Sequence, residues 1–279
     1  MHNDAALRQR LFPYAYNILG SVEDSEDILQ NVIIKSLQKS GIENETAYLI
    51  RAVINESINF KKRRDRIIKK DVWLPEPYAT NEGEGNLESK EILQYSMLVL
   101  LERLNINERA VFLLKEAFGY THQEISTALS MSDQNTRQLL SRAKKKLKER
   151  QFYPIHASSQ HAGYLEKYIT TIRQGDVKTL ETMLAGEIQV LADGGADIHV
   201  VAQTTTGIAA TTELLLYVYN HYQKDFEIII TQVNHQPALL FYSGTKLINC
   251  QVFETNSKGK ITQIFSIIDP LKLAKIERA

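Results

Sequence analysis

The chain has 279 residues, of which 43% are hydrophobic and 24% charged, a composition typical of a soluble globular protein with two or three domains. Its 33 basic and 33 acidic side chains cancel, so any nucleic-acid contact is expected in local basic clusters and not over the whole surface. The single cysteine, Cys250, excludes an internal disulfide framework, and no apolar run approaches the ~20 residues of a membrane span, so we expect a cytoplasmic protein.

Two amphipathic helices are predicted at the N-terminus. The first covers residues 4–19 and stops at Gly20, while Ser21 caps the second. The first turns of the second helix are crowded with carboxylates, which suit the positive end of a helix. Its apolar stripe leaves a polar, partly acidic face toward solvent, made of Asp24, Asp27, Gln30 and Asn31.

A third helix is predicted from about Thr46 to Arg66, and it ends in the basic run Lys61–Arg66. The run by itself fits either a solvated helix terminus or a nucleic-acid contact. Residues 71–87 then read as a linker, because Pro75 and Pro77 interrupt any helix and a polar, glycine-bearing stretch follows. Since Trp73 lies inside this segment, we expect the linker to be docked on a folded surface.

Two further helices are predicted over residues 88–104 and 107–118, with Asn107 capping the second. The stretch 119–150 then reads as two helices joined by a tight turn. Thr121 and Glu124 have the spacing of a capping box, and Ser132 is a good cap for the second helix. The apolar face of that second helix consists of Thr136, Leu139, Leu140, Ala143 and Leu147.

The stretch 121–150 holds seven Lys or Arg against three Asp or Glu, which favours a DNA-binding helix-turn-helix over an ordinary helical hairpin with a solvated basic face. Arg, Gln and Asn read base edges, and a Lys/Arg-rich continuation neutralises phosphates. One feature is unusual for the motif: Ser130 stands at the turn position where glycine often supplies a left-handed residue.

The last third, residues 160–279, has the pattern of an α+β domain, in which helices cover a curved antiparallel sheet that encloses a pocket. Helices are predicted over residues 164–174, 177–184 and 211–222. Strands are predicted over residues 187–192, 226–233, 238–242, 246–254 and 260–268, with turns at 234–237 and 256–259.

The two helical units together resemble the two conserved regions of extracytoplasmic-function (ECF) sigma factors of the sigma-70 family. The resemblance is carried by ILGSVEDSEDILQNVIIKSL, AYLIRAVINESINFKKRRDRI, LNINERAVFLLKEAFGYTHQEIS and SRAKKKL, in this order. It implies two all-α domains, region 2 (residues 1–70) and region 4 (88–152), which bind core RNA polymerase and promoter DNA. Initiation then needs no cofactor or metal from this chain, because the chemistry belongs to the polymerase.

The resemblance also implies a role for each exposed face. Asp24, Asp27, Gln30 and Asn31 would dock on the β′ clamp helices of the polymerase. The −10 element would be bound by Tyr48, Arg51, Asn55, Lys61, Lys62, Arg63 and Arg64, although Tyr48 fits the core equally well. The −35 element would be read by Asn135, Arg137, Gln138, Arg142 and Lys145.

The C-terminal third is similar to the SnoaL-like domain that extends one, SigJ-like, subgroup of these sigma factors, in which it acts in cis and stands in for a separate anti-sigma protein. Three motifs carry this similarity: the linker Trp73-Leu74-Pro75-Glu76-Pro77, the turn Asp193-Gly194-Gly195 and the tail Asp269-Pro270-Leu271-Lys272-Leu273. Ala196 replaces a third glycine, and the tail departs from the subgroup's Asn-Pro-Asp-Lys-Leu at two positions. We expect the linker to dock near the turn and the tail.

Three alternatives remain open from the residues. The C-terminal pocket could bind an unidentified small molecule, or it could be catalytic, with Asp193, His199 and His235 as the candidate acid or base groups. The chain could also be a plain transcription regulator with a sensor domain, which would leave the acidic helix at Asp24–Gln30 and the helix of residues 46–66 without a role. The sequence identifies no separate anti-sigma partner.

Overall fold

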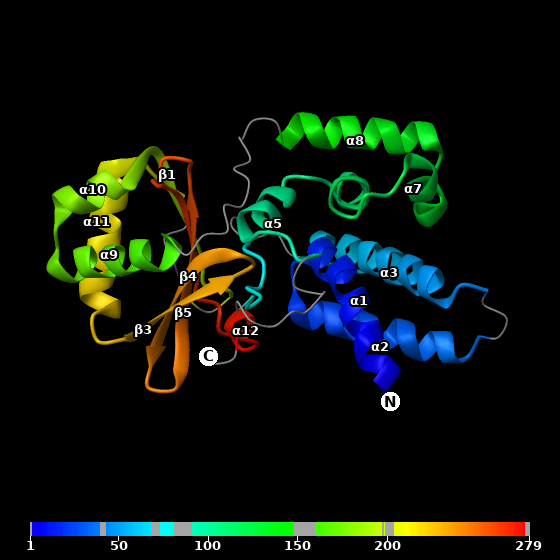
Figure 1. Cartoon of the computed structure of the whole chain (residues 1–279), viewed down its shortest axis with the longest axis horizontal. Helices are drawn as coiled ribbons and strands as arrows, with labels where there is room; N and C mark the ends of the chain where they lie inside the picture. Colours follow the sequence, from blue (N-terminus) through cyan, green and yellow to red (C-terminus); the bar gives the residue numbers. More distant parts are fainter. Residues whose placement is uncertain are drawn as a thin grey trace. The chain divides into compact units, whose positions relative to one another are not determined.

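We describe a computed structural model of the chain, which covers residues 2–39, 43–67, 73–80, 91–147, 160–196, 198 and 204–276. The chain divides into two compact units. The first combines Met1–Lys69 with Glu84–Gln151, and the second combines Lys70–Gly83 with Phe152–Ala279. The two helical regions therefore share one unit, and the described part of the linker, residues 73–80, belongs to the C-terminal unit. Figure 1 labels the helices and strands of both units.

The part of the chain expected to be region 2, which keeps that name below, consists of α1 (His2–Leu19), α2 (Val22–Leu37) and α3 (Glu45–Ile67). Gly20 ends α1 in the left-handed region at φ 68°, and the Ser21 hydroxyl accepts a hydrogen bond from the Asp24 amide at 3.1 Å, as the sequence predicts. The buried side chains of the three helices form one core: Leu11, Ala15, Ile18, Leu19, Ile28, Leu29, Val32, Leu49, Val53 and Ile54.

The part expected to be region 4, which likewise keeps that name below, contains α5 (Tyr95–Leu101), α6 (Ile106–Phe112), the π-helical turn η1 (Leu113–Ala117), α7 (His122–Leu129) and α8 (Asp133–Leu147). The single helix expected over residues 88–104 is wrong, because residues 92–94 are not helical. The Asn17 side chain explains the interruption: it donates to the Glu91 carbonyl at 2.8 Å and accepts from the Leu93 amide at 3.1 Å. A side chain from a distant helix thus takes up backbone groups that a helix would use.

The cap of α6 is Asn105 and not Asn107. Asn105 and Glu108 form a full capping box, in which each side chain bonds the other's backbone amide. In the helix-turn-helix the predicted box of Thr121 and Glu124 is confirmed. Ser130 takes the left-handed conformation, at φ 52° and ψ 48°, that the turn requires.

The C-terminal unit is built on a six-stranded sheet with the order β2-β1-β6-β5-β4-β3. The strands are β1 (Leu184–Asp193), β2 (Thr205–Thr206), β3 (Glu227–Val233), β4 (Gln236–Ser243), β5 (Lys246–Thr255) and β6 (Ile261–Ile267). The expected antiparallel sheet is confirmed for all neighbours except one, since β1 pairs with β6 in parallel. The parallel pair brings the ends of β1 and β6, at Asp193 and Ile267, to the same edge.

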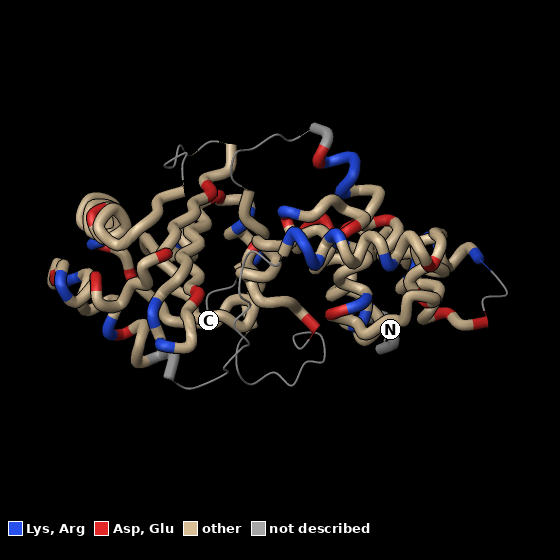
Figure 2. The backbone as a smooth tube through the Cα atoms, turned by 90° about the horizontal axis from the view of Figure 1, so that it is seen from above, with Lys and Arg blue, Asp and Glu red and all other residues tan. Residues whose placement is uncertain are grey.

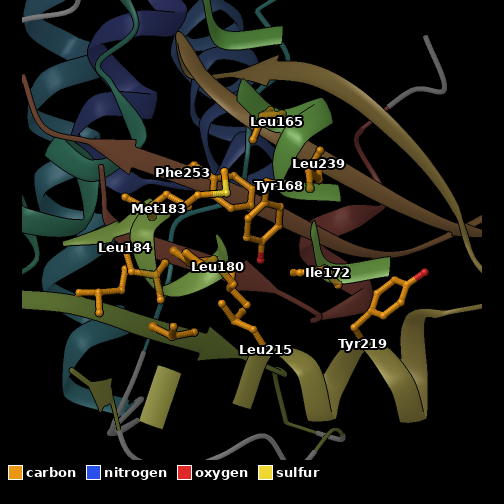
Figure 3. Close-up of a cluster of buried hydrophobic side chains, with 14 of the residues drawn as sticks. Leu165, Tyr168, Ile172, Leu180, Met183, Leu184, Leu215, Tyr219, Leu239 and Phe253 are labelled. Atoms are coloured by element: carbon orange, nitrogen blue, oxygen red, sulfur yellow. The ribbon is translucent and has the colours of Figure 1, made fainter. Parts of the chain in front are cut away.

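Helices α9 (Gln160–Gln174), α10 (Val177–Met183) and α11 (Ile208–Val218), the last continued by the π-helical turn η2 (Tyr219–Gln223), pack on one face of this sheet. Their apolar side chains and those of the strands form a single buried cluster, in which Tyr168 meets Phe253 edge to face with ring centroids 5.0 Å apart (Figure 3). A short helix, α12 (Pro270–Leu273), follows β6 and packs against β5.

Candidate functional site

The linker, the end of β1 and α12 meet in one buried polar cluster. The Asp193 carbonyl accepts from the Ile268 and Asp269 amides at 2.8 and 3.1 Å, which joins the turn after β1 to the chain leaving β6. One Asp193 carboxylate oxygen accepts from the Gly195 amide at 2.9 Å, and the other faces the linker. Only 2% of Asp193 is exposed.

Lys272 completes the cluster from α12. Its ammonium donates to the Asp193 carboxylate and to the Leu74 carbonyl, both at 2.5 Å. The Leu74 amide donates in turn to the same carboxylate at 2.8 Å, so both backbone groups of Leu74 are held. The ammonium also lies 4.5 Å from the centre of the Trp73 ring, in a cation–π contact. The contact therefore recognises the linker by its backbone and by one aromatic ring.

The charge of Asp193 is maintained in this buried place. Burial by itself raises the pKa of a carboxyl group, but the Lys272 ammonium and the Leu74 amide hold the pKa of Asp193 below its usual value. The pair is therefore a charge-assisted contact between an ionised carboxylate and an ammonium, which is stronger than a neutral hydrogen bond.

The linker has a second anchor at the β3–β4 turn, which the sequence analysis missed. Asn234 and His235 both have positive φ, 49° and 59°, as a tight hairpin turn requires. Asn234 bonds both backbone groups of Tyr78, through its amide at 2.8 Å and its side-chain oxygen at 2.9 Å. The His235 amide donates to the Thr80 hydroxyl at 2.8 Å. An asparagine at the tip of a hairpin is the signal that could have suggested this anchor.

The structure thus brings together most of the residues predicted for linker docking. Trp73, Asp193, Gly195, Asp269 and Lys272 lie in the cluster. Pro75 and Pro77 are buried along the docked linker. Pro270 is the first residue of α12 and is exposed. Gly194 has a steric role, because a Cβ there would lie 2.1 Å from the Ile198 carbonyl oxygen.

We expect Gly195→Ala to disrupt the cluster. Gly195 has φ +71°, and an added Cβ would lie 2.5 Å from the Asp269 carboxyl group. Left-handed strain costs about 1–2 kcal/mol, so the clash should bring the loss in free energy of unfolding to at least about 2 kcal/mol. Gly259→Ala is the matched control, because Gly259 has φ +72° with open space around it. Urea unfolding measures both variants, and equal losses would contradict the steric role of Gly195.

The residues predicted to read the −35 element all lie exposed on α8: Asn135, Arg137, Gln138, Arg142 and Lys145. Arg137 pairs with Asp133 at 3.0 Å one turn earlier on the same helix, which holds its guanidinium near the start of α8. Lys144, Lys145 and Lys146 extend the positive charge through the last turn (Figure 2). The face begins with groups that are able to read base edges. Of the lysines that follow, Lys144 pairs with Glu116 and Lys146 with Glu108, both at 2.7 Å.

The residues predicted for the −10 element are not equally exposed. Lys62 and Arg63 reach solvent, whereas Lys61 is buried. Tyr48, which the sequence left between core and surface, is half-buried beneath the Lys39 ammonium. Arg51 and Asn55 form hydrogen bonds with region 4. The predicted −10 surface is therefore partly occupied by the chain's own side chains.

The predicted polymerase-docking face on α2 lies open at Asp27, Gln30 and Asn31. Asp24 is half-buried instead, because its carboxylate pairs with Arg64 at 3.0 Å. Arg64 also donates to the Leu19 carbonyl at 3.1 Å. The basic end of α3 and the acidic start of α2 thus hold each other within region 2.

Where a pocket was expected in the C-terminal domain, the described residues include a cavity of about 20 Å³, between α9, α11, η2 and strands β3 to β5. This volume is close to the roughly 10–15 Å³ that one water needs. Two buried polar atoms at its lining residues, the Tyr168 hydroxyl and the Gln251 side-chain oxygen, have no hydrogen-bond partner. Asp193 and His235 do not line this cavity, and His199 falls outside the described residues.

In the described part of the chain, no group of three or more His, Cys, Asp or Glu side chains could hold a metal ion. None of the helices there has the length and apolarity needed to cross a membrane.

Comparisons with known proteins agree with this architecture. Residues 95–147 match the family model for sigma-70 region 4. The chain is 26% identical to the probable ECF RNA polymerase sigma factor SigI of Mycobacterium tuberculosis, over 96% of this chain and 92% of SigI. It is 25% identical to the ECF RNA polymerase sigma factor SigJ of the same organism, over 78% of this chain and 72% of SigJ. The crystal structure of M. tuberculosis SigJ superposes with a TM-score of 0.78 at 21% identity, covering 98% of this chain and 97% of that one.

Proposed function

We propose, for a chain that belongs to the extracytoplasmic-function sigma factors of the sigma-70 family, that its SnoaL-like C-terminal domain controls promoter-specific initiation in cis through the docked linker. The observation that carries this proposal is the cluster of Asp193, Lys272 and Leu74, in which the C-terminal unit holds the segment joining region 2 to region 4. Because residues 73–80 belong to the C-terminal unit, the chain joins that unit to region 2 before the linker and to region 4 after it, so a change in the unit can reach both regions.

We assign the roles of the exposed faces on the same premise. The open polar residues of α2 would dock on the β′ clamp helices of core RNA polymerase, where charge complementarity sets orientation and rate of association. The exposed face of α8 would read the −35 element, and Lys62 and Arg63 of α3 would hold the backbone at the −10 element. All of these partners place the protein in the cytoplasm.

The cis control is tested by loosening the linker without touching the predicted DNA-binding residues. Trp73→Ala removes the ring over the Lys272 ammonium, a loss of about 1 kcal/mol that shifts a docked-to-released equilibrium about fivefold. We expect the transcript yield from a cognate promoter, with core polymerase supplied, to change correspondingly. Trp73→Phe keeps a ring and is the control. If hydrogen exchange of the linker amides increases in Trp73→Ala while the transcript yield stays unchanged, control through the linker is rejected.

A second function for the C-terminal domain is ligand sensing, and one observation favours it. The Tyr168 hydroxyl and the Gln251 side-chain oxygen offer a donor and an acceptor with no partner at an apolar cavity. Since the cavity holds little more than a water molecule, a metabolite would have to displace lining side chains. Catalysis is not proposed, because Asp193 is engaged by Lys272 and His235 lies in the hairpin turn.

A further inference from the structure

Region 4 covers part of the α3 face that is proposed to meet the −10 element. The Arg51 guanidinium donates to the Ser130 hydroxyl at 3.2 Å, and the Asn55 side-chain amide donates to the Ala128 carbonyl at 2.9 Å. Ala128 and Ser130 lie at the end of α7, in the turn of the helix-turn-helix. Two of the predicted −10 residues therefore bind the turn of region 4.

A buried ionic network closes the same interface nearer the basic end of α3. The Lys61 side chain is 3% exposed, and its ammonium lies 3.0 Å from the Glu102 carboxylate at the end of α5. Arg109 of α6, which is fully buried, forms an ion pair with the same carboxylate. It also donates twice to the Asn17 carbonyl of α1, at 3.1 and 2.9 Å. Two cations share one anion, and the network ties α1 and α3 to region 4.

We infer that the packing of α3 against α6 and α7 is an autoinhibitory contact, which must open before α3 can bind the −10 element. The inference rests on the proposed role of α3. The Lys61 ammonium is buried against Glu102, while one guanidinium nitrogen of Arg51 and the side-chain amide of Asn55 bind region 4, so these donors must be released before they can bind DNA. The reading face of α8, in contrast, is exposed. The closed chain is therefore competent for the −35 element only, and a partner that binds the open form shifts the population toward it.

Two substitutions open the contact in different ways. Glu102→Gln removes the anion shared by Lys61 and Arg109 and leaves two buried cations facing each other. Ser130→Gly removes only the acceptor of Arg51, and glycine adopts the left-handed conformation of residue 130 more readily than serine does. Glu116→Gln is the matched control, because its ion pair with Lys144 lies in region 4 but is half exposed.

Lysine acylation of the free full-length chain, followed by mass spectrometry of the peptides, measures closure directly. Burial and the neighbouring Arg109 cation lower the pKa of Lys61 to about 8, so its amine would react faster than an ordinary lysine if reagent reached it. We expect Lys61 to react at least about tenfold more slowly than Lys62, because only Lys61 is buried. Equal reactivity of the two lysines would overturn the inference.

The functional arm measures binding of each variant to DNA that carries the −10 element alone. Glu102→Gln should speed Lys61 acylation and strengthen this binding at least about threefold, Ser130→Gly should do both to a smaller extent, and Glu116→Gln should change neither. If acylation rises while binding does not, the contact is structural and the inhibition is rejected. A double variant, Lys62→Ala with Arg63→Ala in the Glu102→Gln background, reports separately on the role of α3: full retention of binding there would reject the proposed −10 contact itself.

Discussion

Lys272→Met is expected to lower the free energy of unfolding of the C-terminal unit by about 3 kcal/mol and to release the linker. The substitution keeps the length and apolar stem of the side chain but leaves the Asp193 carboxylate buried without its cation, and the Leu74 carbonyl without its donor. Hydrogen exchange of the Leu74 amide and urea unfolding of the full chain measure the two effects. Lys258→Met, at an exposed turn, should change neither.

The pH dependence of this loss of stability in Lys272→Met tests whether the charge of Asp193 causes it. Because its pKa is depressed in the folded protein, its contribution is fully present above the pKa of an unfolded aspartate and is lost as the pH falls through the folded value. The difference in stability between the unsubstituted chain and Lys272→Met should therefore be constant near neutral pH and shrink in acid. A difference that is independent of pH down to acid unfolding would contradict the charged pair.

Arg109→Leu should have a comparably large effect on the helical unit, a loss of about 3–5 kcal/mol, because it removes one partner of a buried ionic network. Leucine leaves the Asn17 carbonyl without two of its donors and leaves Glu102 with Lys61 as its remaining cation. The unfolding should be confined to the helical unit, while the sheet of the C-terminal unit keeps its hydrogen-exchange protection.

Arg103→Leu is the control for this prediction, since Arg103 is exposed six residues earlier in the same region. Segment-resolved hydrogen exchange distinguishes the units, with α1, α3 and α6 expected to lose protection together. Loss of protection in α6 alone would show that Arg109 supports only its own helix. In that case the network would not be what ties region 2 to region 4.

Several features of this protein follow from short-range rules and were predictable. The capping box of Thr121 with Glu124 and the cap at Ser21 depend on residues three apart, so the sequence contains all that is needed to place them. The exposed face of α8 follows from helical periodicity. Asn105 and Glu108 obey the same capping rule, so the sequence also allowed the cap of α6 to be predicted at Asn105 and not at Asn107.

Other features depend on partners far apart in the chain. The break before α5 is made by Asn17, more than seventy positions away in the chain, and the parallel pairing of β1 with β6 joins segments from opposite ends of the domain. No local pattern encodes such contacts, because the free energy that selects them comes from packing the whole unit.

For function, the sequence by itself determined the class of protein, the basic helix-turn-helix and the linker motif with its turn and tail. Only the tertiary structure decided that Lys61 is buried against Glu102 and Arg109, and that Asp193 and Lys272 hold the backbone of Leu74. The physical reason is that a charged side chain has no fixed role until folding sets its solvent exposure and its counter-ion. A lysine that is exposed to water can bind a phosphate, whereas a buried lysine can form an ion pair that stabilises an internal interface.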